Sequence, residues 1–205
     1  MSKKEVIVRN TTIASLFGLL LMVSGAYWDV QWHFLTGRES LFILPHRLVM
    51  LGVLIVILAS GFAIGEIKKQ KNKGEKKILT NLKGIFIGAF LVVIAYVIDE
   101  MWHRKFGTDV IVGTPPHLLM ISSAPIIAVF LIKLNNSVKK SKYYNIITET
   151  IIAFSLIGFS IVVSDWEYYK ILPSYYIIHE LPKWIYNLYT VSAFMLVYGL
   201  SKKFY

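Results

Sequence analysis

The sequence contains no cysteine, and this absence removes several kinds of chemistry at once. Without thiols there can be no disulfide, no thiolate nucleophile, no iron–sulfur cluster and no thiolate-rich zinc or copper(I) site. Any metal ion bound by this chain must therefore be held by nitrogen and oxygen ligands.

Charged residues are also scarce. They make up 17% of the 205 residues, whereas 56% are hydrophobic and 14% aromatic, and the mean hydropathy is +0.59. The apolar residues form runs close to the roughly 20 residues that a helix needs to cross a bilayer core. This composition excludes a disordered chain, a disulfide scaffold and an ordinary cytosolic enzyme.

The apolar runs predict an all-α fold: a polytopic membrane helical bundle of about six transmembrane helices. We expect a single integral membrane domain over residues 1–205, built as three hairpins at about 12–66, 82–134 and 147–200. The individual spans are predicted at about 12–28, 45–66, 82–101, 116–134, 147–164 and 184–200.

The basic residues predict the orientation of the bundle in the cell membrane. Most of the 22 lysines and arginines lie in the N-terminal arm, after the second and fourth spans, or after the sixth: Lys3, Lys4, Arg9, Lys68, Lys69, Lys71, Lys73, Lys76, Lys77, Lys83, Lys133, Lys139, Lys140, Lys142, Lys202 and Lys203. The positive-inside rule then places both termini in the cytoplasm. All five histidines and all five tryptophans are expected on the outer side.

An internal repeat lies on that outer side. Asp29-Val30-Gln31-Trp32-His33 is followed by Pro45-His46, and Asp99-Glu100-Met101-Trp102-His103 is followed by Pro116-His117. The copies are about 70 residues apart, and each joins the outer end of one span to the start of the next. In the third hairpin Asp165 and His179 lie at similar places, but Tyr169 replaces the first histidine.

The first span has a competing interpretation as a cleaved signal peptide. It follows lysines and an arginine and ends in the small residues Ser24-Gly25-Ala26. The repeat disfavours cleavage, because the first copy would lose the helix that its twin keeps.

The spacing within each copy predicts a metal site. Asp29 and His33 are four residues apart, so both side chains project from one helix face, and His46 follows a proline suited to the start of the next helix. The second copy repeats this arrangement with Asp99, His103 and His117. Three ligands leave an open coordination position, as a catalytic metal requires. The competing interpretation is a hydrogen-bonded polar cluster at the membrane edge.

Imidazole suits zinc, copper, iron and nickel, and copper has the highest affinity for such nitrogen and oxygen sites. We therefore predict copper, with zinc as the alternative occupant, at Asp29, His33, His46, Asp99, His103 and His117. No residue is assigned a catalytic role.

These ligands resemble a known family. The pattern D-x3-H-x12-H at Asp29, His33 and His46 resembles the copper site in the C-type subunit of particulate methane monooxygenase and ammonia monooxygenase. The second set has the spacing of that family's adjacent copper site and is similar to the archaeal ammonia monooxygenase form, which commonly has asparagine in place of Asp99. The similarity covers roughly residues 25–125.

The resemblance implies copper-dependent activation of dioxygen to hydroxylate a small substrate such as ammonia or a short hydrocarbon. It also implies assembly with A- and B-type subunits into a trimer of heterotrimers. A membrane metal transporter or metal sensor is the alternative, although transporters place ionisable groups near the midplane, not at one surface. A bis-histidine haem protein ranks last, because an aspartate lies one turn from a histidine in each copy.

Overall fold

The computed structural model describes residues 2–36, 42–70, 75–106, 115–137 and 149–151. These residues form four long helices, α1 (Lys3–Thr36), α2 (Leu44–Lys68), α3 (Glu75–Phe106) and α4 (Pro115–Asn135), and contain no strand. All four helices are long and apolar enough to cross a membrane. The prediction of a helical protein with membrane-spanning character is therefore confirmed for the described part of the chain.

The third predicted hairpin falls almost entirely outside the described residues. Only residues 149–151 of its first span are described, and they are helical. The second span of that hairpin, with Asp165, Tyr169 and His179 before it, also lies outside the described ranges. The total of six spans and the three-hairpin arrangement remain predictions.

The helices are longer than the apolar runs that predicted them. The span predicted at 12–28, for example, becomes the helix Lys3–Thr36. Its start is fixed by a capping box, in which the Glu5 backbone N–H donates to Ser2 Oγ at 3.2 Å and the Ser2 backbone N–H donates to Glu5 Oε2 at 2.8 Å. Hydropathy detects only the apolar part of such a helix, because the backbone hydrogen bonds continue into polar sequence.

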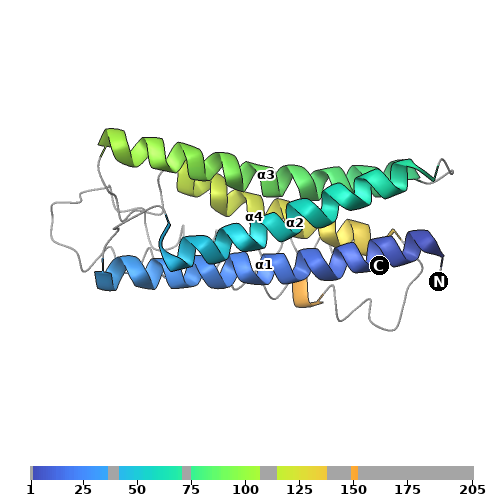
Figure 1. Cartoon of the computed structure of the whole chain (residues 1–205), viewed down its shortest axis with the longest axis horizontal. Coiled ribbons are helices and arrows are strands. Elements are labelled where there is room, and N and C mark those ends of the chain that lie inside the picture. The colour runs from blue at the N-terminus through green and yellow to red at the C-terminus, as the bar shows by residue number, and fades with distance from the viewer. Residues whose placement is uncertain (1, 37–41, 71–74, 107–114, 138–148, 152–205) are drawn as a thin grey trace, which may run out of the picture.

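The four helices run lengthwise beside one another (Figure 1). α1 packs against α2, α2 against α3, α3 against α4, and α1 also touches α4. The core between them is apolar and includes Leu19 of α1, Val53 of α2, Ile85 of α3 and Leu131 of α4, each at most 1% exposed. Large apolar side chains are also exposed on the outer faces, among them Phe17, Leu58, Phe62 and Phe90, as expected where lipid covers a protein.

Glycines allow a close contact between α1 and α2. A Cβ atom built on Gly18 would lie 2.7 Å from the backbone oxygen of Gly52, and one built on Gly25 would lie 2.8 Å from the backbone nitrogen of Val49. Small residues permit this approach of two backbones, which is the common way for helices to associate in lipid. This contact sets how the end of α1 meets the start of α2.

Three buried hydroxyl groups in the spans, those of Thr12, Ser60 and Ser123, are satisfied within their own helices. Thr12 Oγ1 donates to the Val8 carbonyl at 2.9 Å, Ser60 Oγ to the Val56 carbonyl at 2.6 Å, and Ser123 Oγ to the Leu119 carbonyl at 2.7 Å. A polar group in an apolar surrounding is costly without a partner, and the carbonyl one turn earlier provides one.

One end of the bundle carries lysines. Lys3 Nζ of α1 lies 3.2 Å from Glu66 Oε2 near the end of α2, and Lys69 Nζ lies 2.7 Å from Glu66 Oε1. Because α1 and α2 run antiparallel, the aspartate and histidine motifs lie at the opposite end, which we call the histidine end (Figure 1).

The glycine contact predicts the effect of adding a single methyl group. In Gly52→Ala the new Cβ would lie 2.9 Å from the Met22 backbone nitrogen and closer still to the Gly18 carbonyl. We expect overpacking to cost about 1–3 kcal/mol, measured as a lower midpoint of thermal unfolding in detergent.

Gly65→Ala is the matched control, because nothing lies within 4 Å of a Cβ at Gly65 in the same helix. We expect it to be neutral or slightly stabilising. Equal effects of the two alanines would contradict the close α1–α2 contact.

Candidate metal centre

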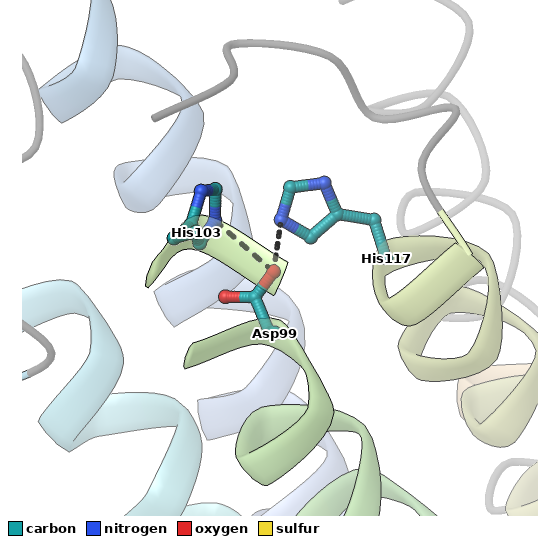
Figure 2. A group of neighbouring side chains, drawn as sticks. All are labelled: Asp99, His103 and His117. Atoms are coloured by element: carbon teal, nitrogen blue, oxygen red, sulfur yellow. Dashed lines mark ion pairs between the residues drawn. The ribbon is translucent and has the colours of Figure 1, made fainter. Parts of the chain in front are cut away.

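Asp99, His103 and His117 converge at the histidine end. Asp99 and His103 lie one turn apart near the end of α3, and His117 lies in the first turn of α4, directly after Pro115-Pro116 (Figure 2). Asp99 Oδ1 lies 3.2 Å from His103 Nε2 and 3.2 Å from His117 Nε2. The structure thus brings together all three residues of the second predicted site.

The three side chains differ in exposure. The Asp99 side chain is 4% exposed and that of His103 is 7% exposed, whereas His117 is 26% exposed. The carboxylate is therefore largely shielded, and the cluster is most accessible from the His117 side. A shielded carboxylate needs a nearby positive charge or hydrogen-bond donors, and the two imidazoles are placed to provide them.

The donor set also fits a metal ion. One donor atom from each residue can be chosen so that all three lie within 4.8 Å of one another. Bonds of about 2.0–2.1 Å in a tetrahedral site separate neighbouring nitrogen and oxygen ligands by roughly 3.3 Å. The two separations of 3.2 Å at Asp99 Oδ1 are close to this value, whereas donor atoms within the set lie up to 4.8 Å apart, so the two imidazoles would have to move closer together to bind one ion.

The first predicted site is assembled in part. His46 Nε2 lies 2.9 Å from Asp29 Oδ1, with the histidine side chain 7% exposed and the aspartate 25% exposed. His33 lies in α1 one turn after Asp29, as the spacing predicted, but its side chain is outside the part that the structure describes. The Asp29–His46 contact joins α1 to α2 in the way that the Asp99–His117 contact joins α3 to α4.

The start of α2 positions His46. The residue before the helix, Ile43, is extended with φ −60° and ψ 157°, and Pro45 lies in the first turn. Arg47 Nε donates to the Phe42 carbonyl at 2.7 Å, so its side chain folds back over the connection that leads into the helix. These features fix the point at which the chain turns from extended to helical.

Tyr96 joins the first site, although the sequence motifs do not include it. This residue lies on α3, is 8% exposed, and its ring meets that of His46 edge to face, with centroids 5.4 Å apart and an interplanar angle of 86°. Its only signal in the sequence is its position three residues before Asp99, which puts both on one face of the helix.

The neighbouring carboxylates Asp99 and Glu100 provide a stability test of the cluster. Asp99→Ala would remove the carboxylate that lies 3.2 Å from both imidazoles, and we expect a loss of about 1–3 kcal/mol of unfolding free energy. The measurement is thermal or denaturant unfolding of the metal-free protein in detergent.

Glu100→Ala is the control. Glu100 Oε1 pairs with Arg104 Nε at 2.9 Å, and the arginine side chain is 78% exposed, so we expect a loss below about 1 kcal/mol. If Asp99→Ala lowered the unfolding free energy no more than Glu100→Ala, the contacts of Asp99 with the imidazoles would not stabilise the protein.

No protein-family model, curated protein or solved structure matches the chain. The function must therefore be argued from the residues of the site itself.

Proposed function

We propose that this chain is a copper-binding integral membrane protein, and that it corresponds to the C-type subunit of a copper-dependent monooxygenase. The observation that carries the metal-binding part is the convergence of Asp99, His103 and His117, whose donor atoms lie within 4.8 Å of one another. The choice of copper and of monooxygenase rests on the resemblance of the two ligand motifs to that family.

The arrangement supports a metal function better than a purely structural cluster. Two copies of one motif bring an aspartate at the end of one helix to a histidine at the start of the next, at 2.9 Å and 3.2 Å. A contact needed only to tie the hairpin together would not need the additional histidine one turn after each aspartate. That histidine makes up the third ligand of a site with an open position.

The six proposed ligands would form two metal sites. Asp99, His103 and His117 would hold one ion, and Asp29, His33 and His46 a second, with the two aspartates lowering the net charge of their sites. Bound copper would supply the binding and activation of dioxygen for hydroxylation of a small substrate such as ammonia or a short hydrocarbon. The partial exposure of His117 and Asp29 leaves a side of each cluster from which small molecules can approach.

The proposal includes partners and an orientation. A- and B-type subunits would complete the enzyme as a trimer of heterotrimers in the cell membrane. The histidine end would face outward and the lysine-rich end the cytoplasm, since lysines flank the Glu66 contact at that end.

The proposal predicts the metal content of paired variants. In protein purified in native-like lipid under copper-replete conditions, His103→Ala/His117→Ala and His33→Ala/His46→Ala should each lose a distinct share of bound copper. The measurement is metal content by mass spectrometry, with copper EPR to follow each share.

Glu100→Ala/Arg104→Ala is the matched control, because these residues form an ion pair on the same turns of α3 without being proposed ligands. It should keep the full copper content. Wild-type protein without copper, or histidine variants that keep it all, would overturn the metal proposal.

Copper content alone does not separate the oxygenase from a transporter or sensor. Oxygen uptake and product formation with ammonia or a short hydrocarbon, measured on the complex isolated in native lipid, make that distinction. Copper without any dioxygen-dependent product would favour a protein that binds metal but has no oxygenase activity.

A further inference from the structure

One face of α3 touches both candidate sites. Asp99 and His103 belong to the second site, and Tyr96, one turn before Asp99, contacts His46 of the first. Positions 96, 99 and 103 fall within a narrow arc of a helix, because they are spaced by three and four residues. The two sites are therefore neighbours joined through a single stripe of α3.

The Tyr96–His46 contact is well defined. The ring planes are almost perpendicular, at 86°, with centroids 5.4 Å apart, which is the preferred edge-to-face arrangement of aromatic rings. Both side chains are largely buried, with 8% exposure for Tyr96 and 7% for the His46 side chain. His46 is thus held on one side by Asp29, at 2.9 Å, and on another by the tyrosine ring.

We propose that Tyr96 is the positioning residue of the first metal site: its ring fixes the His46 imidazole with Nε2 directed at Asp29. This inference rests on the proposed function, since it concerns the same site. Groups that orient a ligand imidazole tune metal affinity, because an unheld ring must lose rotational freedom when the ion binds. Tyr96 performs this role by ring contact from a third helix.

The test measures copper binding at the first site alone. All variants are made in a His103→Ala/His117→Ala background, so that only the first site is left. Tyr96→Leu removes the aromatic ring, and we expect its copper dissociation constant to rise roughly 3- to 10-fold, the factor that corresponds to one aromatic pair. Tyr96→Phe keeps the ring and should bind within about 2-fold of the background protein.

Two controls separate positioning from a general loss of structure. Phe90→Leu removes an aromatic ring from α3 at an exposed position, where the ring stacks on Phe86, and should leave copper binding unchanged. Tyr96→Leu in a His33→Ala/His46→Ala background should leave the copper dissociation constant of the second site unchanged within about 2-fold, which also shows that the variant is folded.

Copper EPR should show a broader or shifted signal for Tyr96→Leu at the first site and an unchanged signal for Tyr96→Phe.

The outcomes are distinct. Weaker binding and an altered EPR signal in Tyr96→Leu, with recovery in Tyr96→Phe, support the inference. Copper binding that is the same in Tyr96→Leu and the background protein overturns it while the proposed metal function stands. If Tyr96→Leu weakened copper binding equally at both sites, Tyr96 would be a general packing residue and the inference would be overturned. Absence of copper from the wild-type protein would overturn both proposals.

Discussion

The buried carboxylate of Asp99 is the constraint on which the histidine end depends. A charged group shielded from water at the end of an apolar helix is costly unless oppositely charged or hydrogen-bonding groups surround it. The groups closest to Asp99 Oδ1 in this cluster are Nε2 of His103, one turn along its own helix, and Nε2 of His117 from the next helix, each 3.2 Å away. The requirement ties α3 to α4, and the Asp29–His46 contact ties α1 to α2 in the same way.

The rest of the bundle makes these contacts available. Gly18, Gly25 and Gly52 let α1 and α2 approach until their backbones touch, while Gly88 faces Ile127 between α3 and α4. Helices held this closely keep their ends in register, so an aspartate at the end of one helix meets a histidine at the start of the next. The prolines at the starts of α2 and α4 begin those helices at the required points.

Much of this arrangement could be predicted from the sequence, because it depends on local geometry. Apolar runs predicted the centres of the four described helices, and the four-residue spacing predicted that Asp99 and His103 share a face. The repeat predicted that His46 and His117 would reach the preceding aspartates. The full extent of α1 was missed, because its capping residues and polar ends carry no hydropathy signal.

The role of Tyr96 could not be predicted, because it depends on which face of α3 meets α2. That choice is made by packing along the whole bundle, and no short motif encodes it. The motif predicted which residues gather within each hairpin, whereas the contact between hairpins required the structure.

Counting the imidazole ligands of a single bound copper tests the central claim most directly. In a His33→Ala/His46→Ala variant labelled with 15N-histidine and loaded with copper(II), pulsed EPR should detect two coordinated imidazoles, those of His103 and His117. Coupling to one imidazole or none would show that Asp99, His103 and His117 do not form a metal site.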